Sequence, residues 1–233
     1  KFYGFFLAGV ATYNLFGYGT AVWVPSYFIR VHGWEASSAG ITLGSLYLAP
    51  AIIGALSSGW LADYFYSKGY KTAPLFIKFI AVLLIGPLIL LFIYLPLIEA
   101  KIIALVLFSL VESMSGVLFP TVLQMSTPNR IRGQVSAISL MIINLVGIGF
   151  GATTIALVTD YVFQDELAVG HSIAVVGVIT CAISLCCFFL ALKPFKQQVS
   201  IVMGDGRERT EEKKEQTKDN DTVDLPPNKA IDY

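Results

Sequence analysis

Six long apolar runs, separated by short polar stretches, constrain the fold of this chain more than any other feature. A helix of about 20 apolar residues crosses the roughly 30 Å hydrocarbon core of a bilayer. An open sheet would leave backbone groups unpaired in lipid, so the runs predict transmembrane helices. The expected spans cover residues 2–28, 39–60, 73–95, 102–123, 135–159 and 172–192. We therefore predict an all-α membrane protein in which residues 1–196 form a six-helix domain.

The distribution of charge separates a polar tail from this apolar domain. Hydrophobic residues make up 55% of the 233 residues and charged residues 14%, against about 25% charged in a soluble domain. Fifteen of the 32 acidic and basic residues fall within residues 197–233. Because this tail has almost nothing to bury, we predict that it is disordered. The formal net charge of zero argues against a nucleic-acid partner.

Lysine and arginine near the ends of the spans predict the orientation, since cytoplasmic loops are enriched in both. One side has only Arg30 and Lys101. The other side has Lys1, Lys68, Lys71, Lys78, Arg130, Arg132, Lys193 and Lys196. Both ends of the chain are therefore expected in the cytoplasm, which agrees with an even number of spans. We expect a multi-pass protein of a cell inner or plasma membrane.

Glu112 is the only acid near the centre of a predicted span. Ionisable groups at membrane depth are costly, which makes them candidates for function. Small and polar residues share its helical face, namely Ser109, Ser113, Gly116 and Pro120. This face either lines a cavity, where Glu112 would bind substrate or protons, or places a buried, hydrogen-bonded acid at a helix contact.

Polar residues in the first span form a second candidate cluster. Tyr13 and Asn14 lie at mid-depth, each followed one turn later by Gly17 or Tyr18. They either form a cavity wall or mediate helix packing, two uses that membrane helices make of such residues. The Gly147-x3-Gly151 pattern in the fifth span predicts a close helix contact.

Residue sets for enzyme chemistry are missing from the sequence. The three cysteines fall in one apolar run without metal-ligand spacing, and neither an HExxH nor a nucleotide-binding GxxxxGK[ST] motif occurs. Both histidines, His32 and His171, fall in predicted outer loops, away from any mid-membrane serine. We therefore predict no enzymatic activity, no metal and no cofactor.

The segment after the second span contains Gly59, Asp63, Lys68 and Lys71. A glycine at this place would let two helices approach, and Asp63 near a helix C-terminus would need a positive partner. An ordinary basic inner loop is the alternative interpretation. The pattern resembles the cytoplasmic signature loop of the major facilitator superfamily, although Tyr64 and Tyr66 replace its usual base and glycine.

A second segment, residues 127–163, adds to this resemblance. Its Pro128-Asn-Arg130-x-Arg132-Gly-Gln pattern is similar to the loop before the penultimate helix of facilitator transporters. The later Asn144-to-Gly151 run, together with Trp23-Val-Pro25 in the first span, resembles the spinster-like branch. Carriers of sugar acids and other organic anions share several of these features.

The resemblance implies a twelve-helix transporter built of two six-helix halves, each a pair of inverted three-helix repeats. The motifs match the C-terminal half, and the start at Lys1 rather than Met also predicts a fragment. The implied function is proton-coupled alternating access, with Glu112, Tyr13 and Asn14 in the cavity. The gate would contain Gly59, Asp63, Lys68, Lys71, Arg130 and Arg132.

The implied partners are a small-molecule or lipid-like substrate, membrane lipid and an N-terminal six-helix half. The apolar, aromatic first span would suit an amphiphilic substrate. Two alternatives remain open: an organic-anion or sugar-acid symporter of the same fold, and a complete six-span scaffold or homodimer that transports nothing.

Overall fold

A computed structural model describes residues 2–223 of the chain. Within these residues the structure is helical, with no strand. The α-helices are α1 (Phe2–His32), α2 (Ala36–Ser67), α3 (Ala73–Tyr94), α4 (Ile98–Ser126), α5 (Arg132–Leu157) and α6 (Val169–Val223). A π-helical turn, η1 (Val158–Phe163), and a 3₁₀ turn, η2 (Glu166–Ala168), connect α5 to α6.

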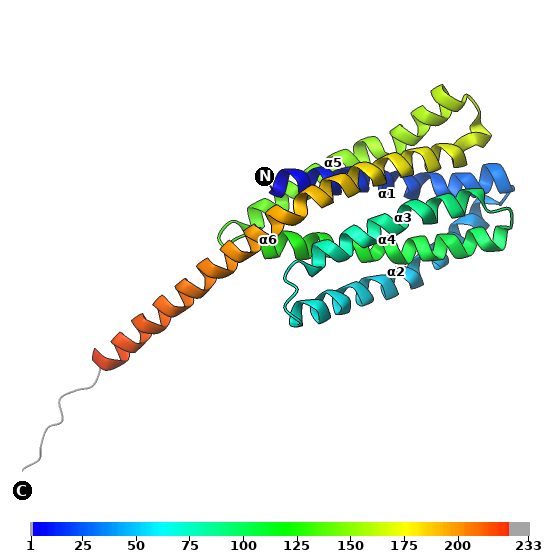
Figure 1. The fold of residues 1–233 in the computed structure, drawn as a ribbon. Coiled ribbons are helices and arrows are strands. Elements are labelled where there is room, and N and C mark those ends of the chain that lie inside the picture. The colour runs from blue at the N-terminus through cyan, green and yellow to red at the C-terminus, as the bar shows by residue number, and fades with distance from the viewer. Residues whose placement is uncertain (1, 224–233) are drawn as a thin grey trace, which may run out of the picture.

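The helices run alternately up and down a bundle (Figure 1). The connections α2–α3 and α4–α5 lie at the end where the chain begins, and α6 leaves the bundle at the same end. Short connections produce this alternation because successive helices must turn back within a few residues. Arg30, in the last turn of α1, and Lys101, in the first turn of α4, lie at the opposite end.

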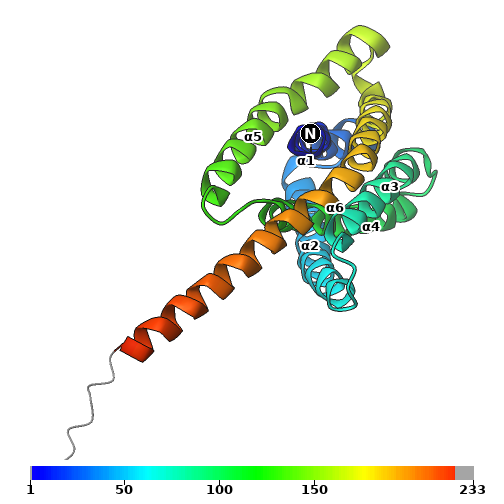
Figure 2. The same ribbon diagram turned by 60° about the vertical axis from the view of Figure 1, so that its left-hand side comes forward.

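The first helix of each three-helix group packs mainly on helices of the other group. α1 packs mainly on α5 and α6, whereas α4 packs mainly on α2 and α3. Contact between α3 and α6 joins the two groups, and Figure 2 shows α1 between α5 and α6. Each leading helix therefore sits against the second and third helices of the other repeat. This is the arrangement expected of two inverted three-helix repeats.

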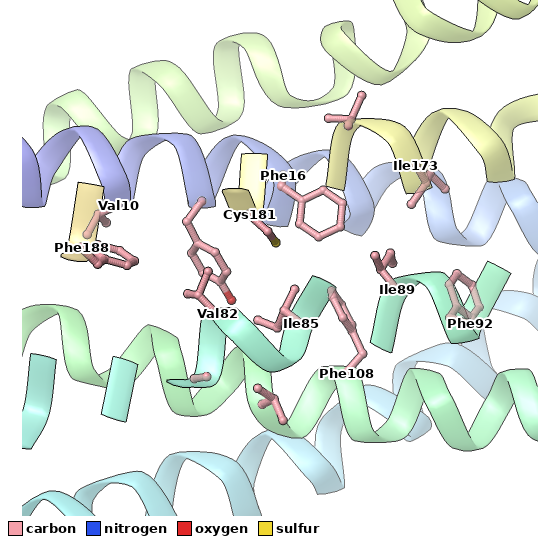
Figure 3. Packing of buried hydrophobic residues seen from close by; sticks show 14 of the residues in the cluster. Val10, Phe16, Val82, Ile85, Ile89, Phe92, Phe108, Ile173, Cys181 and Phe188 are labelled. Atoms are coloured by element: carbon pink, nitrogen blue, oxygen red, sulfur yellow. The ribbon is translucent and has the colours of Figure 1, made fainter. Parts of the chain in front are cut away.

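Aromatic and branched side chains fill the space between these groups (Figure 3). Phe16 of α1 meets Phe108 of α4 edge-on, with ring centroids 6.2 Å apart. Phe188 of α6 lies on the same cluster, with its ring 6.1 Å from that of Phe6. Edge and tilted contacts suit the quadrupole of aromatic rings, so these residues fix α1, α4 and α6 in one core.

Glycine permits the closest helix contact, as the sequence predicts. A Cβ built on Gly151 would lie 2.5 Å from the carbonyl oxygen of Leu15, and one on Gly147 would overlap the Tyr18 ring. α5 therefore rests against α1 backbone to backbone. Gly54 makes the equivalent contact between α2 and α4, because its Cβ would overlap the carbonyl oxygen of Leu110.

By length and composition, five helices of the described chain could cross a membrane: Ala36–Ser67, Ala73–Tyr94, Ile98–Ser126, Arg132–Phe163 and Glu166–Val202. α1 is equally long, at 31 residues, but is not among them. Its tyrosine, glycine, tryptophan and asparagine lower its hydropathy. α1 packs on both α5 and α6, so it can cross a membrane with neighbours shielding these residues.

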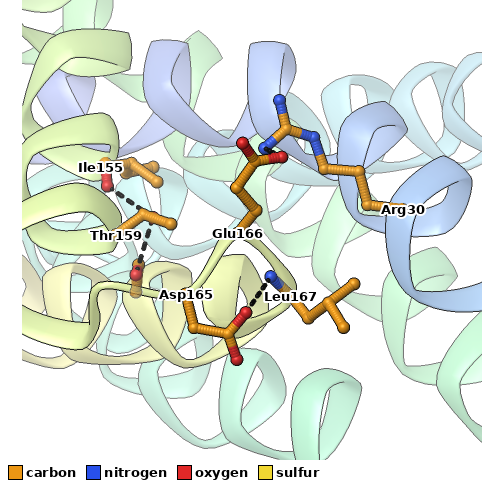
Figure 4. A network of polar contacts seen from close by, with 7 residues as sticks. Arg30, Ile155, Thr159, Asp165, Glu166 and Leu167 are labelled. Atoms are coloured by element: carbon orange, nitrogen blue, oxygen red, sulfur yellow. Dashed lines mark hydrogen bonds and ion pairs between the residues drawn. The ribbon is translucent and has the colours of Figure 1, made fainter.

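The α5–α6 connection is more ordered than a loop (Figure 4). Asp165 accepts a hydrogen bond from the Leu167 amide at 2.9 Å and caps the 3₁₀ turn. Thr159 donates to Ser172 at 2.8 Å, which ties η1 to α6. Arg30 reaches Glu166 at 3.6 Å. The last predicted outer loop is therefore a capped turn held by side-chain hydrogen bonds and an ion pair.

The start predicted for the tail is wrong, because α6 continues as a helix through residue 197 to Val223. Residues 207–218 are mostly Arg, Glu, Lys and Gln, which have high helix propensity. A helix that continues from a packed segment needs no separate nucleation, so low hydrophobicity does not prevent it from forming. The remainder of the predicted tail, residues 224–233, lies outside the described residues.

Candidate substrate cavity and cytoplasmic gate

Glu112 lines a cavity of about 260 Å³ between α1, α2 and α4. Its carboxylate approaches α1 at Gly17, where a Cβ would lie 3.2 Å from Glu112 Oε1. The other lining residues are Thr20, Ala21, Pro25, Gly40, Leu43, Gly44 and Tyr47. Small residues on α1 and α2 thus leave room beside the only acid at this depth.

Two serines hold α4 so that Glu112 faces the cavity. Ser109 donates to the Tyr47 carbonyl at 3.2 Å, and Ser113 donates to the Ala51 carbonyl at 2.7 Å. Both acceptors belong to α2, so these residues fasten one side of α4 and rotate Glu112 toward α1. Among the side-chain hydrogen bonds between described residues, none involves the Glu112 carboxylate.

Tyr13 does not line this cavity. Its side chain is only 4% exposed and belongs to the hydrophobic core. Its hydroxyl is buried without a hydrogen-bond partner in the described chain. Tyr13 lies one turn from Gly17 on α1, but its ring faces Lys78 of α3, which also lies over the Phe188 ring of α6.

Asn14 also lies outside the cavity. Its Nδ2 donates to the Val10 carbonyl of its own helix at 2.9 Å. The neighbouring helix contact is made instead by Tyr18, whose hydroxyl donates to Asn144 Oδ1 on α5 at 2.9 Å. This side of α1 therefore serves packing against α5, and Glu112 is the one cavity candidate that lines the space.

Lys78 is the main residue that sequence reasoning missed. The charge count places it in an inner loop, but it lies in α3 and is 1% exposed. Its ammonium donates to the Ser115 carbonyl at 2.7 Å and to the Ser115 hydroxyl at 3.0 Å. The only signal was its position five residues inside the third predicted span, since a lysine near a span end usually reaches outward to water.

The predicted outer cation Lys101 is also buried, at 7% exposure in the first turn of α4. Its ammonium donates to the Tyr27 hydroxyl and to the Ile93 carbonyl, each at 2.6 Å. Ile93 lies in the last turn of α3, where carbonyls lack partners within the helix. Lys101 therefore closes the end of α3, a favourable position for a cation.

Gly59 and Asp63 lie inside the last turns of α2 and not in a loop. No atom lies within 4 Å of a Cβ built on Gly59, so the predicted close approach at this glycine is wrong for this conformation. Gly54, five residues earlier, makes that contact because the rotation of α2 directs it at α4. Asp63 is exposed beside a small cavity lined by Pro74, Thr121 and Met125.

The bases of the predicted gate are not joined to Asp63. Lys68 donates to the Tyr64 hydroxyl at 2.6 Å, and Lys71 and Arg130 are exposed. Arg132 is half-buried and donates to the Thr127 carbonyl at 3.4 Å. Among the residues that the structure describes, the only ion pair is Arg30–Glu166, at the other end of the bundle. These charged residues lie near the same end of the bundle, but they do not form a latch in this conformation.

A larger groove of about 490 Å³ lies between α2 and α3, with α4 behind it. Its wall is apolar, with residues such as Phe65, Ile77 and Leu84 and no charged side chain. A charged ligand would lose its hydration there without gaining a partner. The groove therefore belongs to the apolar outer surface and not to the site around Glu112.

Comparison with known proteins decides the family. The Major Facilitator Superfamily model matches residues 2–152, more than half of the chain. The chain belongs to the major facilitator superfamily. The resemblance inferred from the two loop motifs is thereby confirmed.

Solved structures share the fold of this facilitator chain. A bacterial homolog to the human lysosomal transporter Spinster, inward-facing and occupied, aligns with a TM-score of 0.67 at 17% identity over 84% of this chain and 50% of its own. The unoccupied inward-facing form aligns with a TM-score of 0.66 at 17% identity over 84% of this chain and 48% of its own. The chain thus spans about half the length of these structures, and the likeness shows the fold.

A curated relative adds a sequence match. The uncharacterized transporter YybO of Bacillus subtilis (strain 168) is 32% identical over 65 residues, which are 28% of this chain and 14% of that protein. The match is short, but it agrees with the assignment to a transporter family.

Proposed function

We propose that this chain is the C-terminal six-helix half of a secondary active transporter that works by alternating access and is coupled to protons through Glu112. The observation that carries the proposal is the Glu112 carboxylate beside the 260 Å³ cavity formed by α1, α2 and α4. Ionisable groups inside a membrane mark substrate or proton pathways by default. Both motif loops favour the C-terminal half, which an N-terminal half would complete.

Protonation of Glu112 would control closure of the cavity. Burying a carboxylate costs far more free energy than burying a neutral carboxylic acid. Water in an open cavity stabilises the ionised form, whereas a closed cavity favours the protonated form. A proton bound from one side would therefore permit closure and be released after opening to the other side. Tyr13 and Asn14 would act behind this site, through the core and the α1–α5 contact.

The gate residues would work in another conformation. Asp63 lies near the C-terminus of α2, where the helix dipole disfavours an anion. A positive partner from Lys68, Lys71, Arg130 or Arg132, or from the N-terminal half, would relieve this cost. Because none of these is paired with Asp63 here, the ion pair would favour one state and be broken in the other, as a latch requires.

An amphiphilic, lipid-like molecule is the substrate class that the cavity favours. The cavity wall combines one acid with glycine, alanine, proline, leucine and tyrosine, and no basic side chain lines it. An organic-anion symporter would need a cation facing the substrate, which would then have to come from the N-terminal half. Competition by lysolipids and by sugar acids in the same flux assay separates the two. The lysine and arginine bias supports a location of both chain ends in the cytoplasm, in a plasma or inner membrane.

The test is substrate flux driven by a pH gradient in proteoliposomes containing the full-length protein. Glu112→Gln should reduce gradient-driven flux at least tenfold, because the amide cannot carry the proton. Glu99→Gln is the matched control, since Glu99 is exposed in the first turn of the same helix. Unchanged flux and an unchanged pH profile in Glu112→Gln would refute the proposal. Flux absent even from the unmodified protein would favour the scaffold or homodimer.

A further inference from the structure

The apolar groove between α2 and α3 follows one face of α3. Its floor consists of buried side chains at helical spacing, namely Ala73, Ile77 and Ala81. Its rim consists of larger, exposed side chains, namely Phe76, Ile80 and Leu84. α2 and α3 both pack mainly on α4 and touch each other little, and the small alanines do not fill the space between them. An apolar channel therefore remains on the outer surface of the bundle.

The length of this groove matches one leaflet of a bilayer. Its lining on α3 runs from Thr72 to Leu84, and twelve helical steps rise about 18 Å. The hydrocarbon core is roughly 30 Å thick, so one leaflet accounts for about 15 Å. On α4 the groove ends at Val111 and Met114, which flank the mid-span residue Glu112. The groove therefore extends from the bundle end to about the midplane, as an acyl chain does.

The outer end of the groove has the side chains of a membrane–water interface. Tyr70 and Thr72 line this end, and Trp60 and Tyr64 are exposed in the last turns of α2. Tyrosine and tryptophan concentrate at the level of lipid headgroups. The Thr72 hydroxyl, at the N-cap of α3, makes no capping hydrogen bond. Polar groups thus meet the groove only where a headgroup would lie.

Basic side chains at this end supply the charge that an anionic headgroup requires. Lys71 lies between the lining residues Tyr70 and Thr72 and is exposed. Lys68, the C-cap of α2, uses one of its three N–H donors within the chain. Within the described part of the chain, neither lysine belongs to an ion pair. Asp63, an acid of the same bundle end, lines a different cavity, so it does not oppose an anion in the groove.

We propose that this groove binds an anionic phospholipid of the cytoplasmic leaflet, with an acyl chain between α2 and α3 and the phosphate at Lys71. The apolar wall accepts the chain of any phospholipid, so the lysines determine which headgroup is preferred. The cytoplasmic leaflet, which this bundle end faces in the proposed orientation, carries the anionic lipids. The inference goes beyond the proposed transport and does not depend on Glu112, which lines a separate cavity.

The test maps lipid contacts of the full-length protein by photo-crosslinking. The protein is reconstituted in dioleoylphosphatidylcholine vesicles with a trace of phosphatidylglycerol that carries a diazirine at mid-chain, and labelled peptides are quantified by mass spectrometry. Residues 72–84 should be labelled about fivefold more than the exposed face of α6 at Phe189 and Leu190, the factor expected from one basic side chain near the membrane surface. Added dioleoylphosphatidylglycerol should remove this excess, whereas the same amount of phosphatidylcholine should not.

Two variants test the headgroup and the chain separately. Lys71→Gln should reduce groove labelling to the level of the α6 face, whereas Lys196→Gln, an exposed cation of α6 at the same bundle end, should not change it. Ala81→Phe places a ring in the groove floor and should exclude the acyl chain. Leu83→Phe, on the exposed face of α3 outside the groove, is its control.

Three results would overturn the proposal. Equal labelling of the groove and the α6 face would mean that only ordinary bilayer lipid contacts the groove. Absence of label from residues 72–84 would show that the N-terminal half or another protein segment covers it. Groove labelling that survives Lys71→Gln would remove the assigned headgroup contact. Should Ala81→Phe not fold, the comparison of Lys71→Gln with Lys196→Gln decides alone, because both side chains are exposed.

Discussion

The α1–α5 contact supports the most direct test of the packing. A Cβ on Gly151 would lie 2.5 Å from the Leu15 carbonyl oxygen and 2.9 Å from the Gly19 amide nitrogen. Both are backbone atoms, so no side chain can rotate to make room. Ordinary contact begins near 3.4 Å, so Gly151→Ala must push α5 from α1 by about 0.9 Å, the difference between 3.4 and 2.5 Å.

This displacement loosens a long helix contact, including the neighbouring contact of Gly147 with the Tyr18 ring. Overpacking a close-packed interior costs about 1–3 kcal/mol. We expect the upper half of that range, about 2–3 kcal/mol, because backbone atoms form the obstacle. For a domain of this size, each kcal/mol lowers the melting temperature by about 2–4 °C, so a fall of roughly 4–12 °C should result.

Gly149→Ala is the matched control in the same helix. Gly149 is exposed, and no atom lies within 4 Å of its Cβ. Alanine there should leave the melting temperature unchanged or raise it, because glycine costs a helix about 1 kcal/mol relative to alanine. The measurement is thermal unfolding of the detergent-solubilised protein, followed by loss of the monodisperse peak. Equal melting temperatures for Gly151→Ala and Gly149→Ala would refute the reasoning.

Two further perturbations separate packing from gating. Tyr18→Phe removes the hydrogen bond to Asn144 and should cost about 0.6 kcal/mol of stability, the average for such bonds between membrane helices. If Tyr18→Phe costs the same stability in an Asn144→Ala background, the hydrogen bond is not the cause. Asp63→Ala should reduce transport about tenfold, the middle of the range for conformational coupling. Its melting temperature should not change, because Asp63 is exposed and unpaired among the described residues. Asp160→Ala, an exposed acid at the opposite end, is its control, and normal flux in Asp63→Ala would exclude the latch.

Local properties of the sequence were sufficient for five of the membrane helices and for the family. For five helices, hydrophobicity over about 20 residues is enough to indicate a membrane span without knowledge of the neighbours, whereas α1 depends on the helices packed around it. The spacing of Gly147 and Gly151 likewise predicts a close contact, because two small residues one turn apart form a flat helix face. The loop motifs around Asp63 and Arg130 were sufficient for the superfamily.

The rotation of each helix about its axis was decided only by tertiary packing. The sequence predicts both Tyr13 and Glu112 as polar residues at mid-membrane depth. Packing of α3 and α6 directs Tyr13 into the core. Hydrogen bonds of Ser109 and Ser113 direct Glu112 to the cavity. Gly54 rather than Gly59 meets α4 for the same reason.

Lys78 shows the limit most clearly. A lysine near a span end can extend to water or remain inside, and the sequence around it is the same in both cases. It remains inside because Ser115, Tyr13 and Phe188 converge on it from three other helices. The sequence by itself therefore determined five of the membrane-length segments, since hydrophobicity is a local property. The tertiary structure decided which side chains face one another, because that depends on partners distant in the chain.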